Sequence, residues 1–268
     1  MQQLALKSFR QVGNRRGAAD TLNNIGNVFV ETGDYDEARK NYEQGLAEMQ
    51  EISYKPGQPA PMGGIGDTYF YQGDLVKGRK GYEDAMTLGK ELDDADYVAQ
   101  VAVALAALDL AEKKYSEGET LAAQSAARFE KNNSPSNGAW ANAILSRHLL
   151  GEGKLQEAQV AAAEAMKLAR EGPGRAAQYE AGFADVRVKA KTGKFAEARK
   201  EAEAARDSAH KFGYKVYEYQ ARLALCEIEM WSRSATAGAD LAALEKDARA
   251  HGALLVADQA KALSEHAR

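Results

Sequence analysis

The sequence predicts an all-α fold in which antiparallel helix pairs stack into an α-solenoid. The first observation is a repeat, because Gly33 and Gly73 lie 40 residues apart and Gly153 and Gly193 repeat that spacing, with Lys113 at the position between. A period in this range is typical of a stacked array. The second is composition: the chain is 45% hydrophobic with only 5 prolines, and much of its apolar content is alanine, the best helix former.

We expect one domain over residues 1–268, because each unit of an array needs only its neighbours. Residues 1–14 are predicted to be the trailing helix of a preceding repeat, since Leu6, Phe9 and Val12 match a pattern found 40 residues later. They belong either to a longer protein, which we favour, or to a cap. About six helix pairs follow, with a C-terminal capping helix at 253–268; the repeats are placed at 18–57, 58–97, 98–137, 138–177, 178–217 and 218–252.

Each unit is predicted to contain two helices joined by a glycine turn, since glycine suits the left-handed residue that ends a helix. Asp34 follows the first turn and can cap the next helix, and Glu37 would complete a capping box. A column of small residues then predicts a close helix crossing, where a larger side chain would overpack. Its members are Ala38, Gly78, Gly118, Ala158, Ala198 and Gly238.

The ends of the pattern are less regular. In the fifth unit Asp185 falls in an apolar column, so the register predicts a buried aspartate there. In the last unit residues 231–234 replace the glycine turn. The final helix combines leucines with Lys261, Glu265, His266 and Arg268, as expected of a cap with a polar outer face.

Charge and cysteine content exclude several classes of protein. The net charge of −4 argues against nucleic-acid binding, which needs a basic face. The most apolar run, residues 98–111, is too short to span a bilayer. The single cysteine, Cys226, cannot form an internal disulfide, and we expect it to be a buried, inert thiol. No signal-peptide core opens the chain, so we expect a cytoplasmic protein, with an exported protein that lost its signal as the alternative.

The columns resemble the tetratricopeptide repeat family. In the first unit the pattern is carried by Leu22, Ile25, Gly26, Phe29, Ala38, Tyr42 and Gly45, and in the second by Met62, Ile65, Gly66, Tyr69, Gly78, Tyr82 and Ala85. The period exceeds the family's usual length of about 34 residues. Longer units look like those of kinesin light chain and of bacterial regulators. The resemblance implies a right-handed superhelix whose first helices line a concave groove for peptides, with no catalytic residues.

Carried over by register, the resemblance places ten residues on the concave face. They are Asn23, Asn27, Asp67, Phe70, Tyr71, Trp140, Arg147, Phe183, Arg187 and Trp231. Aromatic anchors with arginine are typical of binding hot spots, so we expect a protein or peptide partner with an acidic group near Arg147 and Arg187. Aromatic side chains at this spacing also occur in cores, and a slip in the fifth unit would turn Phe183 inward. The lysines of the family's carboxylate clamp are missing, which argues against chaperone tails.

No catalytic constellation or metal-ligand spacing is found among the four histidines and Cys226, so we expect no cofactor and no metal. We expect these histidines to be exposed or partly packed. The preferred hypothesis is a non-catalytic interaction or sensory module of a bacterial regulatory protein. A receptor for a small peptide or metabolite that changes the superhelix is the alternative, and an enzyme built across the groove is the third reading. The oligomeric state and the partner are not fixed by the sequence.

Overall fold

The computed structural model describes residues 2–266, which form fourteen α-helices, one short 3-10 helix and no strand. The predicted all-α solenoid is therefore confirmed. The last two residues of the predicted cap, including Arg268, and the side chain of His266 lie outside the described residues. The helices are α1 (Gln2–Gln11), α2 (Arg15–Thr32), α3 (Tyr35–Glu51), η1 (Lys55–Gly57), α4 (Pro59–Tyr71), α5 (Leu75–Glu91), α6 (Ala95–Ala111), α7 (Tyr115–Lys131), α8 (Pro135–Gly151), α9 (Leu155–Glu171), α10 (Arg175–Lys191), α11 (Phe195–Phe212), α12 (Lys215–Trp231), α13 (Ala237–Ala250) and α14 (Leu254–His266).

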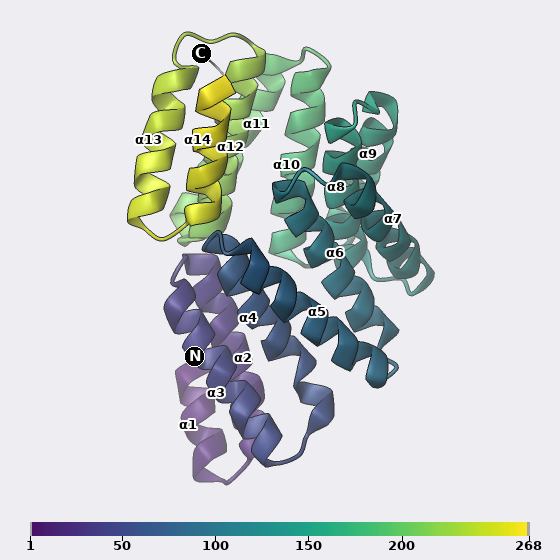
Figure 1. The fold of residues 1–268 in the computed structure, drawn as a ribbon, viewed down its shortest axis with the longest axis vertical. Coiled ribbons are helices and arrows are strands. Elements are labelled where there is room, and N and C mark those ends of the chain that lie inside the picture. The colour runs from purple at the N-terminus through teal and green to yellow at the C-terminus, as the bar shows by residue number, and fades with distance from the viewer. Residues whose placement is uncertain (1, 267–268) are drawn as a thin grey trace.

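Six antiparallel pairs run from α2/α3 to α12/α13, with α1 packed on α2 and α14 packed on α13. The even-numbered helices face the interior, and the odd-numbered helices form most of the outside (Figure 1). No helix within residues 2–266 is both long and apolar enough to cross a membrane.

The solenoid curves until its last helices touch its first ones. Helix α12 packs on α2, and α14 packs on α4, so the yellow-green helices of the last units lie against the purple and blue helices of the first units in Figure 1. We call this contact the seam. Its centre is aromatic and apolar, because Tyr35 and Tyr71 of the first two units share one buried cluster with Tyr217 and Val256 of the last. Burial of this apolar surface stabilises the closed ring.

Two glycine turns permit the close approach at the seam. A Cβ on Gly33 would lie 3.1 Å from the Cβ of Lys215, and one on Gly73 would lie 3.3 Å from the Cβ of Leu254. Both glycines also have positive φ, 83° and 77°, which side chains other than glycine rarely adopt. Each of these glycines thus ends a helix and also leaves room for a residue of the last units to pack against it.

Left-handed residues end helices at intervals of half the repeat. Positive φ recurs at Gly13, Gly33, Ser53, Gly73, Asp93, Lys113, Asn133, Gly153, Gly193, Gly213, Arg233 and Gly252. The series skips residue 173, which is proline and fixes φ near −65°, and Gly172 before it is extended with φ −95° and ψ 149°. The predicted turns, one in each 40-residue unit, join the two helices of a unit. The left-handed residues between them, such as Ser53 and Asp93, end the second helix of each unit.

Side-chain caps begin several helices. The Asp34 carboxylate accepts a hydrogen bond from the Glu37 backbone N–H at 3.4 Å, and Asp74 and Asp94 act in the same way on α5 and α6. The Glu37 carboxylate instead accepts a hydrogen bond from Lys40. The predicted cap at Asp34 is thus present, while the predicted reciprocal half of the capping box is replaced by an ion pair.

The sixth unit departs from the predicted register. Gly238 is exposed, and Ala237 takes the buried place that Ala38, Ala158 and Ala198 occupy in their units. The buried residues Ala237 and Leu241 follow Ala198 and Ala202 by 39 residues instead of 40. The connection also differs here, because five residues (232–236) separate α12 from α13, whereas three (192–194) separate α10 from α11. In the fifth unit Asp185 is not fully buried, because its side chain stays 20% exposed and pairs with Lys189 at 2.8 Å.

We predict opposite stability effects for the same substitution at two glycines. A Cβ on either Gly153 or Gly182 would meet no atom within 4 Å, but only Gly153 has positive φ, at 79°. Gly153→Ala should lower the free energy of unfolding by about 1 kcal/mol, and Gly182→Ala, inside α10, should raise it by about 0.5–1 kcal/mol. Urea unfolding measures both. Effects of the same sign would contradict the assigned turn geometry.

Candidate binding groove

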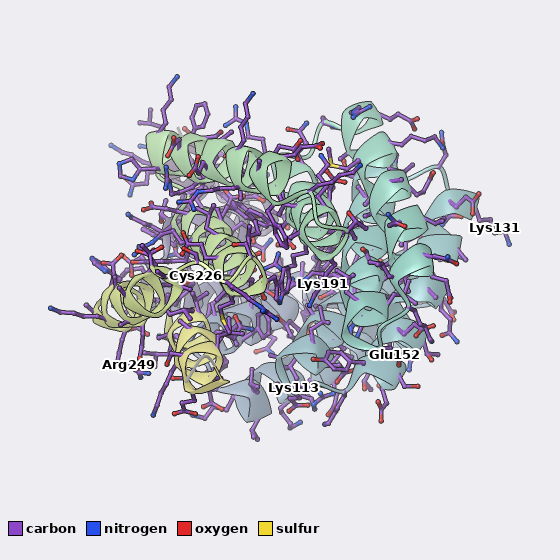
Figure 2. All side chains as sticks on the ribbon, turned by 90° about the horizontal axis from the view of Figure 1, so that it is seen from above. Lys113, Lys131, Glu152, Lys191, Cys226 and Arg249 are labelled. Carbon is purple, nitrogen blue, oxygen red and sulfur yellow. The ribbon has the colours of Figure 1, made fainter. Side chains whose placement is uncertain are left out.

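The interior of the ring contains two connected chambers. The inner chamber is the more enclosed and has a volume of about 70 Å³. The outer chamber has a volume of about 520 Å³, and Gly73, Lys113 and Gly151 are among its lining residues. Both are lined mostly by residues of the even-numbered helices, including α14. The two chambers share Leu110, Arg147, Arg187, Leu223, Leu255 and Gln259. Viewed from above, Lys191 lies toward the middle of the molecule, whereas Lys131 lies at its periphery (Figure 2).

Aromatic side chains line both chambers. Phe70, Tyr71 and Trp140 border the inner chamber, and Trp231 borders the outer one. Tyr71 stacks on Tyr35 with ring centroids 5.7 Å apart, which ties the chamber wall to the seam. Lys191 Nζ lies 4.0 Å from the centroid of the Trp231 ring, a distance typical of a cation–π contact.

Two arginines stand where the chambers meet, but their surroundings differ. Arg187 is nearly buried; its Nε donates to Glu227 Oε2 at 2.7 Å and its Nη1 donates to the Phe183 carbonyl at 2.9 Å. Arg147 forms no hydrogen bond within residues 2–266, and its Nη1 lies 4.0 Å from Glu180 Oε2. Burial lowers the pKa of Arg147, and the neighbouring Arg187 lowers it further. Arg147 is therefore the guanidinium that can accept a new anion.

Two carboxylates line the inner chamber. Asp67 Oδ1 accepts a hydrogen bond from the Tyr82 hydroxyl at 2.6 Å, and burial raises the pKa of Asp67 to about 6. Glu180 is 8% exposed, and its Oε2 accepts no hydrogen bond from the described residues. Burial raises the pKa of Glu180, against the opposing charges of Arg147 and Arg187. Both acids thus lack part of the solvation that ionisation requires.

Most, but not all, of the ten predicted groove residues line the chambers. Asp67, Phe70, Tyr71, Trp140, Arg147 and Arg187 line the inner chamber, and Arg147, Arg187 and Trp231 line the outer one. Three do not. Phe183 is fully buried and stacks on Tyr179 with centroids 6.1 Å apart. The predicted groove position of Phe183 is wrong because the seam fills the interior at its level.

The predicted positions of Asn23 and Asn27 are also corrected. Asn27 is exposed, and its Oδ1 accepts a hydrogen bond from the Tyr42 hydroxyl at 2.7 Å. Asn23 lines a shallow surface pocket beside Tyr54, outside both chambers. The reason is again closure, since α12 packs on α2 and the chambers end there.

Sequence reasoning missed Glu180, Gln220 and the face of α14. A signal existed for the first two, because Trp140, Glu180 and Gln220 form one column of the 40-residue repeat, and all three line the inner chamber. Helix α14 also carried a signal: the alternation of helices makes it the first helix of a further unit. Its Leu255 and Gln259 line both chambers, so α14 closes the groove as well as capping the core.

Other reactive groups lie apart from the chambers. Within the described part of the chain, no three His, Cys, Asp or Glu side chains are placed to hold a metal ion. Cys226 is buried, as predicted, and burial raises the pKa of its thiol to about 12. The expectation that histidines are exposed or partly packed is wrong for His148. This ring is fully buried, and its Cε1 lies 2.0 Å from where a Cβ on Gly118 would stand; glycine at that column leaves room for it.

We predict that Asp67 makes stability fall as the pH rises. Its folded pKa of about 6 exceeds the ordinary 3.8. Between these values only the folded state holds the proton, so folding is favoured below pH 4 and this advantage is lost through pH 6. Relative to Asp67→Asn, the wild type should lose on the order of 3 kcal/mol over that interval.

Urea unfolding of both proteins at pH 4 and pH 7.5 measures this difference. Asp20→Asn, at an exposed site on α2, is the control and should follow the wild type. An identical pH dependence for wild type and Asp67→Asn would contradict the raised pKa.

Comparison with known proteins connects this architecture to a repeat family. A family model described as Tetratricopeptide repeat matches residues 1–51. No curated protein matches the chain.

Several solved structures share the fold. One is a Rap protein complexed with Competence and Sporulation Factor, with 12% identity, a TM-score of 0.65, and coverage of 94% of this chain and 74% of that one. Another is the Rap conjugation gene regulator of the plasmid pLS20 in complex with the Phr* peptide, with 13% identity, a TM-score of 0.64 and the same coverage, 94% and 74%. A third is BtubC from P. vanneervenii, with 18% identity, a TM-score of 0.58, and coverage of 78% and 87%.

Proposed function

We propose that this chain, whose residues 1–51 match a tetratricopeptide-repeat model, is a non-catalytic receptor for a peptide segment. The two chambers form the binding site, and an acidic group of the peptide binds at Arg147. The role that fits such a receptor is the interaction or sensory part of a bacterial regulatory protein.

One observation carries the proposal: Arg147 lines both chambers and makes no hydrogen bond to residues 2–266, while its pKa is lowered by burial. Its one ionic partner, Glu180, lies 4.0 Å away, so a carboxylate that forms short charge-assisted hydrogen bonds to this partly buried guanidinium would improve its solvation. Arg187 is already bonded to Glu227, so it supports the site without being its main anion-binding group.

The aromatic lining and the size of the outer chamber support a peptide ligand. Ligand sites are concave and mostly apolar with a few placed polar groups, and the outer chamber of about 520 Å³ falls within the usual range. One protein with this fold was solved in complex with the Phr* peptide, and another in complex with Competence and Sporulation Factor. At 12% and 13% identity they support the choice of ligand class by analogy alone.

We predict that Arg147→Met weakens peptide binding. Peptides would first be selected from a synthetic random library on the wild type and then titrated by calorimetry. Loss of charge-assisted hydrogen bonds in a buried site should weaken their affinity roughly 10- to 100-fold. Arg222→Met is the matched control, because the side chains of Arg147 and Arg222 are 22% and 24% exposed and Arg222 lies on α12 bonded to Asp247, away from the chambers. Equal affinity of wild type and Arg147→Met would overturn the proposal.

The second candidate function is a receptor whose ring opens and closes around its ligand, and the seam favours it. The seam joins the two ends of the solenoid without a covalent link, and α14 covers part of the groove. A peptide that binds inside must then enter through the outer chamber or displace the seam. Closure around a bound ligand would exclude water and strengthen polar contacts inside.

We predict that a covalent seam slows entry. In Gly73→Cys/Leu254→Cys the Cβ atoms start 3.3 Å apart, near the roughly 3.5–4.5 Å of disulfides, and buried Cys226 does not compete. If the seam opens for binding, oxidation should slow association of the selected peptide at least about tenfold. Reductant should restore it. The single variants control for strain at the left-handed position, and an unchanged rate in the oxidised double variant would show that the seam need not open.

A further inference from the structure

The inner chamber carries an unbalanced negative charge. It is lined by two carboxylates, Asp67 and Glu180, and by two guanidinium groups, Arg147 and Arg187. Arg187 is bonded to Glu227 at 2.7 Å, and Arg147 lies 4.0 Å from Glu180. Asp67 is hydrogen-bonded to Tyr82 and forms no ion pair with the described residues, so the chamber holds one carboxylate without a cationic partner.

The outer chamber has the opposite imbalance. Lys113 and Lys191 line it, and neither forms an ion pair within residues 2–266. Its remaining acid, Asp258, is bonded to Arg249 at 2.8 Å, and Glu227 is taken by Arg187. The groove is thus negative at its inner end and positive at its mouth.

We infer that the inner chamber is a subsite for one primary ammonium group, held by Glu180 and Asp67, and that a ligand enters with this group leading and a carboxylate behind it. The ammonium group is a lysine side chain or the amino terminus of a peptide. The order of the two groups along a bound peptide rests on the proposed function. The ammonium subsite itself is argued only from the residues that line the inner chamber.

Three observations support an ammonium group over other cations. Glu180 Oε2 is buried without a hydrogen-bond donor, and an ammonium group supplies three. The chamber, at about 70 Å³ against about 520 Å³ outside, suits a compact group better than a guanidinium. A metal ion is disfavoured because the described residues offer no set of three ligating side chains.

The ammonium group would also offset the desolvation of the two buried carboxylates. Burial raises the pKa of both Asp67 and Glu180, which means that their charged forms are under-solvated. A cation at hydrogen-bonding distance replaces that solvation. Aromatic faces nearby, at Tyr71 and Trp140, add a favourable surface for the adjoining methylene groups and the charge.

The test uses propylammonium chloride as the probe, with the intrinsic tryptophan fluorescence of the full chain as the readout, because Trp140 lines the inner chamber. Sodium chloride at equal ionic strength and 1-propanol are the reference solutes. The expected result is a saturable response to propylammonium in the millimolar range, which neither reference solute produces.

Glu180→Gln keeps the size of the side chain and removes its charge, so it should weaken the propylammonium response at least about tenfold. Asp67→Asn is the second variant and should act in the same direction. Glu229→Gln is the matched control: Glu229 is also buried, its Oε2 also lacks a hydrogen-bond donor, and it lies outside both chambers. Circular dichroism verifies that each variant is folded.

A wild type that does not respond to propylammonium, or that responds equally with Gln at 180 and Asn at 67, would overturn the ammonium subsite. Because no peptide is used, such a result leaves peptide binding at Arg147 to its own test. The opposite outcome is also distinguishable. If the propylammonium response needs Glu180 but Arg147→Met binds the peptide with unchanged affinity, the ammonium subsite is supported and the peptide proposal is rejected.

Discussion

The seam between the first two units and the last helices governs the rest of the molecule. An open solenoid would present its first helices as a broad concave surface, in contact with water along its whole length. Here α12 packs on α2 and α14 packs on α4, so that surface becomes a lined interior. Charges that water would solvate in an open groove, such as Glu180 and Arg147, are instead enclosed in a medium of lower dielectric constant. The unusual electrostatics of the chambers follow from closure.

Closure also explains which residues sequence reasoning could place. The repeat period predicted the solenoid, the glycine turns and the small-residue column, because these depend on contacts within a unit or between neighbours. Asp67, Trp140 and Arg147 were placed on the interior face for the same reason. Phe183 was misplaced, since it is buried in the cluster where the first and last units meet, a contact between residues about 200 positions apart. A repeat pattern carries no information about how far the superhelix turns.

A second limit on the prediction of the chambers was how single residues at equivalent positions of the repeat were interpreted. Glu180 lies one period after Trp140, so the column was visible, but an acid in it contradicted the expectation of an aromatic and arginine-rich surface. The misplaced Gly238 shows the same effect at the end of the chain. The buried positions of α13 come one residue early, at a 39-residue offset from those of α11, and strict periodicity cannot detect a local change of phase. Departures from the repeat thus concentrate at the seam and at the chambers.

The regular turns described above have a consequence for how such a chain can change its size. Left-handed residues at intervals of about 20 residues hold α2, α3 and α5–α12 to 17 or 18 residues each, so successive pairs add similar rotations to the superhelix. Open arrays can gain or lose a pair and still fold, because only neighbours interact. This ring cannot do so freely: one pair more or fewer would carry Lys215 and Leu254 away from Gly33 and Gly73. Diversification of this architecture should therefore proceed by substitution inside the chambers, at a constant number of units.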